Sequence, residues 1–581
     1  MVKNISKSKI IYFLLFLAAS GAILITNISY DAEYQIAMGY RMLKGDSMLI
    51  EMWEPHQTSA FLCAFLMKLY MMITGTTTGI VLYLNVMGYL IRVGIGYFMY
   101  KIIRRRTGEI PALIAGFLYI LVSPKDLLIP EFSNMELWFG TLTALFLIEY
   151  FEKKKQVYLV LSAVSLCLGV LSYPSFLIAY VAVIFLLIKY SGNSKRDILI
   201  YTGVCALIGG CFVIYVLSRG DLETLLNCLS TALALEPTHT TDSGSKLLVH
   251  GKSIATTVGT LGLFALAGLL AEIVRTIFCR KKSVELSQGK QAEKMARHFS
   301  LENLLIYSWY AGMIYFFIYI FLEVNTGYQA YPLIGILFLG FMKRKLLSES
   351  EQRIYHTAFW LGMVILVATV LLSDHPFIFS VPYMHLAVCF SVMPLFRWFE
   401  KASENVSLRK LMACGVQIFL ILVVLRCIYV HVPMQGRGQL SSLFDDLGLI
   451  RNGPALGIVT NESGAVYQRD SYLEFQEYIE PGDRIWILGL PVDTLGYLYQ
   501  DVEVAAPTVM STPTYTEDLL YYWEVNPEKY PDVVIVSSTY GSIAYELQKC
   551  QWLMNWLEEE YQAETIIEGK WWNYYFKNTK E

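Results

Sequence analysis

The layout of this chain follows from a stretch near its start: Tyr30-Asp31-Ala32-Glu33-Tyr34, continuing through Arg41 and Gly45-Asp46 to Trp53-Glu54-Pro55-His56. The stretch follows the first apolar run of the sequence and precedes the second. Two carboxylates where a chain leaves a membrane are costly unless they have a function. The apolar residues spaced through 32–44 predict a helix lying in the membrane interface. We therefore expect Asp31 and Glu33 to form the acidic centre of a lipid-facing site.

The composition is typical of an integral membrane protein. Of the 581 residues, 55% are hydrophobic and only 16% are charged, whereas about a quarter of the residues are charged in a soluble protein. The basic residues occur in short loop clusters, without the basic face and aromatic platform that nucleic acid requires. We therefore expect membrane lipids as partners and exclude nucleic acid.

Fourteen apolar runs are candidate membrane segments. They are Ile10–Ile28, Ser59–Thr74, Gly79–Tyr100, Ile110–Ser123, Met135–Phe151, Val157–Tyr173, Pro174–Ile188, Ile198–Leu217, Ser253–Val274, Glu302–Leu322, Tyr328–Met342, Ile354–Ser373, Val381–Phe396 and Leu408–Val430. The run Ser59–Thr74 is short and carries Lys68, so we interpret it as a partly submerged segment. The sequence thus predicts a polytopic α-helical protein with about thirteen spans, the first of them an uncleaved signal anchor.

Loop charges set the expected orientation. With thirteen spans, the loops on one side contain 28 Lys plus Arg and those on the other contain 7. This is the positive-inside pattern of a multi-pass protein of the cell membrane. It predicts a cytoplasmic amino terminus and places both the acidic stretch and the carboxy-terminal region outside the cytoplasm.

The composition predicts two domains. Residues 1–434 form the transmembrane domain with its first outer loop at 29–58, and residues 435–581 contain no further membrane-length run. In the second domain we expect strands at Leu456–Thr460, Arg484–Leu490, Val502–Ala506 and Asp532–Ser537, and helices at Tyr472–Ile479, Thr514–Trp523 and Ser542–Glu559. Strands alternating with helices indicate an extracytoplasmic α/β domain with a mainly parallel sheet.

The ten cysteines contain no Cys-x-x-Cys pair. Most lie in apolar runs, where a thiol behaves as a small hydrophobe. Cys228 and Cys550 fall in the regions expected outside the cytoplasm and away from lipid. The sequence leaves open whether they form a disulfide or remain two separate thiols.

The acidic pair has two interpretations. A carboxylate beside an apolar wall has its charged form disfavoured and can act as a base. Acidic groups in a first helical turn also stabilise the helix dipole, which would make Asp31 and Glu33 simple caps. The neighbours Arg41 and His56 favour a site, because a cation and an imidazole on the same loop could hold a phosphate and a hydroxyl.

The second outer loop offers further candidates for substrate binding. Lys125 is its only cation and could contact a lipid phosphate, or extend to the headgroups as membrane-flanking lysines do. Glu131 lies on the same loop, and Glu136 opens the next span as either a helix cap or a second acidic member of the site.

Several familiar catalytic motifs are missing from the sequence. It contains no Gly-x-x-x-x-Gly-Lys-Ser/Thr loop, no Gly-x-Gly-x-x-Gly opening a helix and no Gly-x-Ser-x-Gly elbow. No His/Cys cluster has zinc spacing, so no metal ligands are predicted. An outward-facing enzyme without a nucleotide site needs an activated donor that the membrane itself delivers.

The stretch Tyr30–Phe61 resembles the C-type (GT-C) glycosyltransferases, in particular the aminoarabinose transferase and protein O-mannosyltransferase branch. The resemblance rests on the Tyr30-Asp31-Ala32-Glu33 opening, on Ala37-Met38-Gly39-Tyr40-Arg41-Met42-Leu43-Lys44-Gly45-Asp46 and on Pro55-His56 before a submerged segment. It implies a polyprenyl-phosphate sugar as donor and an acceptor outside the cytoplasm, such as a cell-surface glycan, lipid or protein. It leaves a divalent metal open.

The resemblance also implies a mechanism that inverts the anomeric carbon. Asp31 would take the proton of the acceptor hydroxyl, and Arg41 or Lys125 would stabilise the departing phosphate. The family usually has adjacent acidic residues, whereas Ala32 separates them here, and Pro55-His56-Gln57-Thr58 replaces a His-Pro-Pro or Lys-Pro-Pro segment. Two alternatives are a lipid-linked oligosaccharide flippase or transporter, and a non-catalytic membrane protein that binds a surface polymer.

Overall fold

The computed structural model describes residues 7–577, apart from 27, 55, 123, 125–126, 235–242, 281–300, 323–328, 373–376, 402–405, 432–446, 489–490, 510–519 and 538–550. Lys125, Cys550 and the expected linker after residue 434 therefore lie outside the described residues. Within them, a bundle of apolar helices is joined to a smaller C-terminal sheet domain (447–577).

The expected apolar runs fold as helices. The helices before the sheet domain are α1 (Lys7–Thr26), α2 (Tyr30–Lys44), α3 (Ala60–Thr74), α4 (Ile80–Thr107), α5 (Glu109–Leu121), α6 (Phe132–Lys153), α7 (Gln156–Ser172), α8 (Ile178–Tyr190), α9 (Ser194–Leu217), α10 (Leu222–Ala234), α11 (Ser243–Arg280), α13 (Leu301–Leu322), α14 (Ala330–Lys343), α15 (Glu349–Leu372), α16 (Phe377–Ser380), α17 (His385–Lys401) and α18 (Val406–His431).

Seven of the described helical segments are long and apolar enough to cross a membrane, or eight if the bent pair α1–α2 counts as one span. The prediction of about thirteen spans thus stays a prediction, since several expected runs form shorter helices such as α5, α7 and α8. The segment Gln57–Thr74 is one of the seven by length and composition, and it contains the run Ser59–Thr74 that was interpreted above as submerged.

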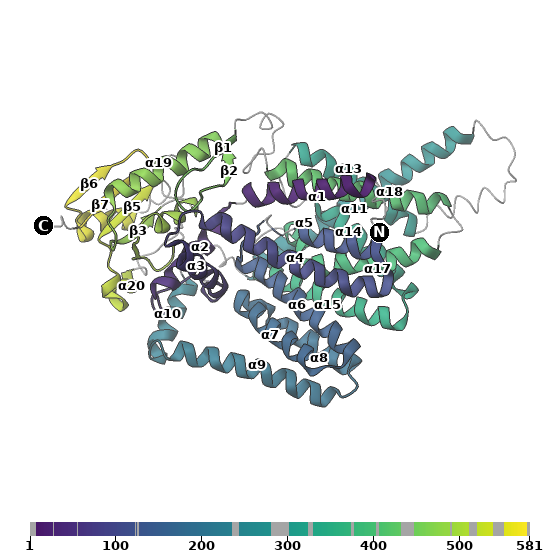
Figure 1. Ribbon diagram of the computed structural model, residues 1–581, viewed down its shortest axis with the longest axis horizontal. Coiled ribbons are helices and arrows are strands. Elements are labelled where there is room, and N and C mark those ends of the chain that lie inside the picture. The colour runs from purple at the N-terminus through teal and green to yellow at the C-terminus, as the bar shows by residue number, and fades with distance from the viewer. Residues whose placement is uncertain are drawn as a thin grey trace.

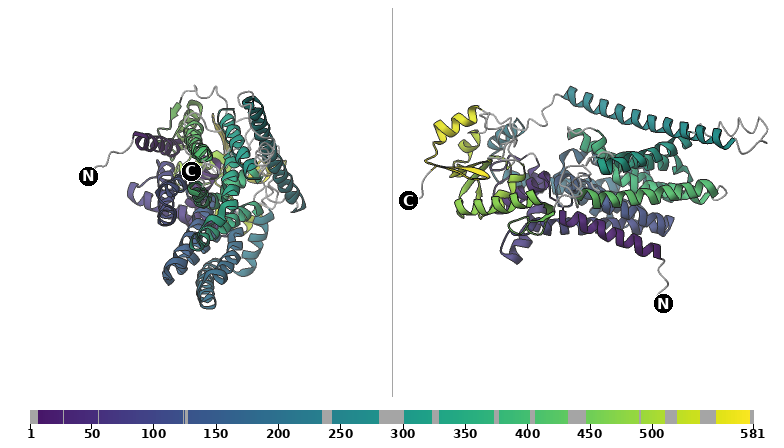
Figure 2. Two further views of the ribbon diagram at one scale, coloured as in Figure 1. Left: turned by 90° about the vertical axis from the view of Figure 1, so that its right-hand side faces the viewer. Right: turned by 90° about the horizontal axis from the view of Figure 1, so that it is seen from above.

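The exposed faces of two helices indicate an apolar environment. In α9 and α11, only 6% of the apolar segment is buried within the protein. Figure 1 shows α9 along one side of the bundle, and Figure 2 shows α11 along another. Water would make such bare apolar helices unfavourable, whereas lipid tails cover them without cost.

Small residues allow the central helices to approach closely, as is common in membrane bundles. A Cβ atom at Gly362 of α15 would lie 2.6 Å from the backbone nitrogen of Ala387 in α17. A Cβ atom at Gly340 of α14 would lie 2.7 Å from the carbonyl oxygen of Ser391, also in α17. The almost fully buried α17 is therefore the axis around which α14 and α15 pack.

The sheet domain is mixed rather than mainly parallel. Its five-stranded sheet has the order β4-β3-β5-β7-β6, in which β3 pairs parallel with β4 and β5, and β7 pairs antiparallel with β5 and β6. The strands are β3 (Arg484–Leu488), β4 (Glu503–Val504), β5 (Val533–Ser537), β6 (Thr565–Glu568) and β7 (Trp572–Phe576). The hairpin β6–β7, which was not predicted, supplies the antiparallel edge.

A separate pair of short strands and three helical segments complete this domain. They are β1 (Leu447–Leu449), β2 (Val459–Asn461), α19 (Glu462–Tyr478), α20 (Leu520–Val525) and α22 (Gln551–Asn555), the last continued by a π-helical turn at Trp556–Tyr561. The central strand β5 is buried along its whole length, as expected for a strand covered on both faces.

The molecule is elongated, with the sheet domain at one end and the helical bundle at the other (Figure 1). Helices α2 and α3 lie between the sheet domain and the bundle. The start of α4 contacts the sheet domain, since the backbone nitrogens of Gly79 and Val81 donate to the carbonyl oxygens of Gly453 (3.1 Å) and Pro454 (3.1 Å). The acidic stretch is therefore held at the junction of the two parts.

Candidate functional site

Asp31 and Glu33 lie in the first turn of α2, where the chain leaves α1. The two helices are bent by 58° relative to each other, and Ser29 before α2 is extended, with φ −158° and ψ 166°. Asp31 is half-buried and Glu33 is buried, with 2% of its surface exposed. The position suits both expected roles, since a first-turn carboxylate stabilises the helix dipole and a partly desolvated one can act as a base.

Helix α2 is fixed against the start of α3. The Gln35 side chain donates to the carbonyl oxygen of Ser59 (3.2 Å) and accepts from the Ser59 hydroxyl (3.0 Å). Gly39 allows close approach, because a Cβ atom there would lie 2.8 Å from Sδ of Met67. Helix α2, which carries the two carboxylates in its first turn, is thus anchored to α3 and the residue before it.

Arg41 is fully buried and links α2 to acidic residues of the same loop. Its Nε donates to Oδ2 of Asp46 (2.7 Å) and its Nη1 donates to Oε1 of Glu54 (2.8 Å). Nη1 also donates to the carbonyl oxygen of Pro507 (3.1 Å). Nη2 donates to the carbonyl oxygen of Glu51 and to the Tyr522 hydroxyl (3.2 Å). A guanidinium has five N–H donors, so in this arrangement Arg41 has none left for a lipid phosphate.

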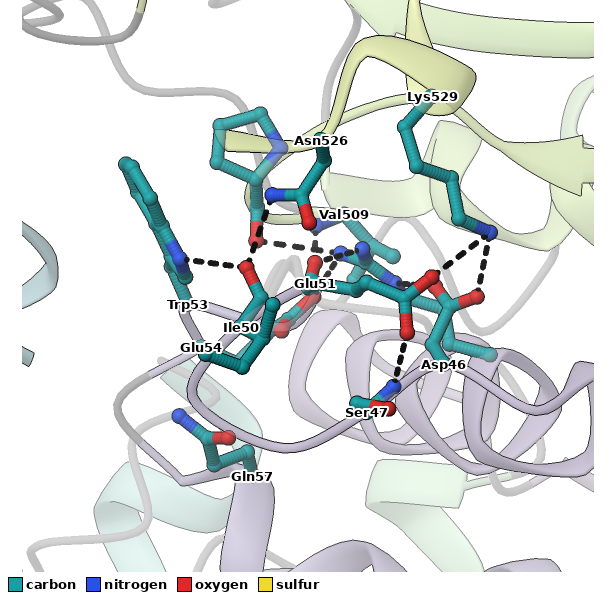
Figure 3. Close-up of polar contacts among 12 residues, drawn as sticks. Asp46, Ser47, Ile50, Glu51, Trp53, Glu54, Gln57, Val509, Asn526 and Lys529 are labelled. Atoms are coloured by element: carbon teal, nitrogen blue, oxygen red, sulfur yellow. Dashed lines mark hydrogen bonds and ion pairs between the residues drawn. The ribbon is translucent and has the colours of Figure 1, made fainter. Parts of the chain in front are cut away.

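Lys529 of the sheet domain completes this ionic cluster. Its Nζ lies 2.6 Å from Oδ1 of Asp46 and 3.7 Å from Oε1 of Glu51. Figure 3 shows Lys529 reaching across from the sheet domain to both carboxylates. We call Arg41, Asp46, Glu51, Glu54 and Lys529 the junction cluster, because it joins the first outer loop to the sheet domain through buried charges.

Burial and charge act against each other in the junction cluster. Burial raises the pKa of Glu54 above its ordinary value, while the positive charge of Arg41 opposes that rise. Burial by itself would lower the pKa of Arg41, but the charges of Glu54 and Asp46 outweigh it and hold that pKa well above its ordinary range. Removing either kind of partner would leave an uncompensated buried charge, which is costly.

Further contacts hold the loop to the sheet domain. The backbone nitrogen of Trp53 donates to the carbonyl oxygen of Pro507 (2.8 Å), and its ring meets that of Tyr522 edge-on at 5.2 Å. The Asn526 side chain donates to the carbonyl oxygen of Ile50 (2.9 Å), as Figure 3 shows. The sheet domain thus determines the shape of the loop that follows the acidic turn.

His56 connects the stretch after α2 to the start of α6. Its imidazole stacks on the ring of Phe132 at 3.9 Å and lies 5.6 Å from the ring of Tyr173, nearly parallel to both. Phe132 begins α6, so His56 lies beside the segment that contains Glu131 and Glu136. The His56 ring therefore lies against the residue that follows Glu131, whereas the Glu136 carboxylate contacts Thr369 of α15.

The two glutamates at the start of α6 have contacts that suit structural roles. Glu131 is the N-cap of α6: its carboxylate accepts from the backbone nitrogen of Asn134 (3.0 Å) and from the Ser133 hydroxyl (2.7 Å). Glu136 is fully buried, and its Oε2 accepts from the Thr369 hydroxyl (3.1 Å), while Oε1 has no hydrogen-bond partner among the described residues. Capping explains Glu131, whereas the second oxygen of Glu136 is left unexplained.

No group of three or more His, Cys, Asp or Glu side chains with metal-binding geometry is found among the described residues. The residues that sequence reasoning missed are those of the junction cluster beyond Arg41. Asp46 and Glu54 stand in the quoted stretch, but nothing in the sequence connects them to Lys529 or Tyr522, which lie more than 460 residues further along the chain.

Comparison with known families places the chain near the glycosyltransferases of the GT-C class. Residues 58–216 match the family model described as dolichyl-phosphate-mannose-protein mannosyltransferase. This match confirms the resemblance to that class and covers α3 to α9, including Glu131 and Glu136. It begins after Asp31 and Glu33. Among curated proteins, no match was found.

Several solved structures are similar at low identity. The chain is 12% identical to the archaeal oligosaccharyltransferase AglB from Archaeoglobus fulgidus in complex with an inhibitory peptide and a dolichol-phosphate, covering 92% of this chain and 70% of that one with a TM-score of 0.42. It is 11% identical to ArnT from Cupriavidus metallidurans bound to undecaprenyl phosphate, covering 98% of both chains with a TM-score of 0.42.

Proposed function

We propose that this protein is an inverting glycosyltransferase that moves a sugar from a polyprenyl-phosphate carrier to an acceptor outside the cytoplasm. One observation carries the proposal: Asp31 and Glu33 share the first turn of a helix that bends away from an apolar helix, at a junction fixed by buried charges. The family-model match over 58–216 supports the choice of a polyprenyl-phosphate-linked sugar as donor. On this proposal the sheet domain and the acidic turn lie outside the cytoplasm.

The proposed reaction is a single displacement. Asp31 accepts the proton of the acceptor hydroxyl while the hydroxyl oxygen forms a bond to the anomeric carbon. The bond from that carbon to the phosphate oxygen breaks, and polyprenyl phosphate leaves with the electron pair. Attack from the face opposite the leaving group inverts the anomeric configuration. Glu33, two residues further along the same turn, is proposed to orient the acceptor or the base.

The departing phosphate needs a cation, and the contacts of Arg41 lead us to propose a different residue for this role. Arg41 has all five donors occupied by protein acceptors, so we propose that it positions the loop instead of contacting the phosphate. Lys125 and His56 remain the proposed substrate contacts of the two outer loops. His56 already lies against the start of α6, next to the loop that carries Lys125.

The test compares the cell-envelope glycans of cells with and without the gene by mass spectrometry. A sugar that disappears on deletion identifies the donor and the acceptor together. Wild type should restore that sugar, and Asp31→Asn should not. The matched control is Asp470→Asn, which makes the same chemical change in a surface ion pair of the sheet domain with Arg469 and Lys570.

Other outcomes would point to the alternative functions. If Asp31→Asn restores the glycan as well as wild type does, the protein is not an enzyme of the proposed kind. If deletion removes the glycan and lipid-linked oligosaccharide accumulates in the inner leaflet, the flippase alternative applies. No change in either measurement would favour a protein that only binds a surface polymer.

A further inference from the structure

A basic pocket lies at the end of the bundle far from the sheet domain. It has a volume of about 440 Å³ and is lined by Met342, Lys343, Lys345, Leu346, Trp398 and Lys401. Helix α4 runs from the sheet domain to this end, where the Arg397 guanidinium donates to the carbonyl oxygen of Arg106 (2.9 Å). On the topology proposed above, this end faces the cytoplasm.

Two of the three pocket lysines are available to a ligand. Lys345 and Lys401 are exposed, and no carboxylate of the described residues pairs with either of them. Lys343 lies 4.5 Å above the ring of Trp398, which forms the pocket wall. Three ammonium groups therefore surround one opening.

Among the described residues, two arginines near the pocket are paired with acids, unlike Lys345 and Lys401. Arg397 pairs with Glu351 (2.5 Å) and with Glu400 (2.8 Å), and Arg106 pairs with Glu152 (2.5 Å).

The pocket also has an apolar side, formed by Met342, Leu346 and the buried Trp398. A free phosphate needs no such wall, whereas a lipid presents a phosphodiester next to glycerol and acyl carbons. Tryptophan at the end of a membrane helix is typical of the headgroup level. Lysines at the ends of α14 and α17 also stabilise the helix dipoles, but that role does not account for Lys345 or for the cavity.

We propose that this pocket binds the headgroup of an anionic phospholipid. The three lysines hold the phosphodiester, and the first acyl carbons pack on Trp398 and Met342. Basic pockets between membrane helices on the cytoplasmic side are suited to anionic headgroups. The inference rests on the bundle being embedded in a membrane and does not depend on sugar transfer.

The test is native mass spectrometry of the full chain in detergent, titrated with phosphatidylglycerol or phosphatidylcholine. Wild type should bind phosphatidylglycerol in preference. The variant K343Q/K345Q/K401Q should bind it about a hundredfold more weakly, given the attraction of each basic residue near an anionic surface. The matched control K101Q/K154Q/K155Q removes three exposed lysines at the same end but outside the pocket, and should bind as wild type does.

A single charge reversal at an exposed residue, Lys401→Glu, guards against misfolding and should also weaken binding. Equal losses in the pocket and control variants would overturn the proposal, as would equal affinity for the two lipids. Displacement of the lipid by excess inorganic phosphate alone would show a free-anion site and would also overturn it. None of these results depends on whether the protein transfers sugar.

Discussion

Replacing Lys529 by Met should release the first outer loop from the sheet domain. The Lys529 ammonium lies 2.6 Å from Oδ1 of Asp46, and the two side chains are 9% and 2% exposed. Removing one partner of a buried pair costs about 3–5 kcal/mol, because the other charge stays buried without compensation. Asp46 keeps its contact with Arg41, so we expect the lower end of that range, about 3 kcal/mol.

Hydrogen–deuterium exchange reports this loss where it occurs. The backbone N–H of Trp53 donates across the junction to Pro507, and that of Val509 donates to Glu54. A loss of about 3 kcal/mol in opening free energy speeds exchange of both amides roughly 150-fold. The matched control is Lys570→Met, since Lys570 pairs with Asp470 at 3.1 Å with its side chain 64% exposed. An exposed pair contributes about 0–1 kcal/mol.

The reasoning would be refuted if Lys529→Met exchanged at Trp53 and Val509 no faster than Lys570→Met. The double variant K529M/D46N supplies a second check. Because it removes both charges of the pair, it should be less destabilised than the sum of the two single variants. Strict additivity would mean that the ion pair is not coupled in the way its geometry indicates.

Three further predictions follow from the same junction and its helix contact. Arg41→Lys should lower the free energy of unfolding by about 3–5 kcal/mol in chemical denaturation, since one ammonium cannot replace five directed donors. Burial raises the pKa of Glu54 above its ordinary value in the folded state. The contribution of Glu54 to stability is therefore fully present below its unfolded-state pKa and falls as the pH rises through its folded-state pKa. Glu54→Gln should remove this dependence and flatten the change of the unfolding midpoint with pH. Gly39→Val should cost about 1–3 kcal/mol by overpacking against Met67, whereas Gly21→Val, with nothing within 4 Å of its Cβ position, should not shift the unfolding midpoint.

Local patterns predicted much of the fold. The apolar runs became helices because a backbone in lipid must satisfy its hydrogen bonds within each segment. The strands β2 to β5 all overlap expected apolar stretches, such as Val533–Ser537 within Asp532–Ser537. Strand β6 of the hairpin β6–β7 was missed because Thr565–Glu568 has only two apolar residues, adjacent to each other, and therefore neither a continuous apolar run nor an alternating pattern.

The candidate site was predictable only where its residues are close in sequence. The position of Asp31 and Glu33 in a first helical turn follows from the run that ends before them. The role of Arg41 does not, because its burial depends on Pro507 and Tyr522 from the other end of the chain. A charged residue in an outer loop indicates a substrate contact and a buried ion pair equally well, and only the tertiary packing distinguishes the two.

The most direct test of the proposed catalytic base is the initial rate of sugar transfer by purified Asp31→Asn, using the donor that the glycan comparison identifies. If Asp31 is the base, the rate should fall by about 10²–10⁴-fold, with the affinity for the polyprenyl-phosphate donor unchanged. A rate equal to that of wild type would contradict the account, since the acceptor hydroxyl would then lose its proton without the carboxylate at position 31.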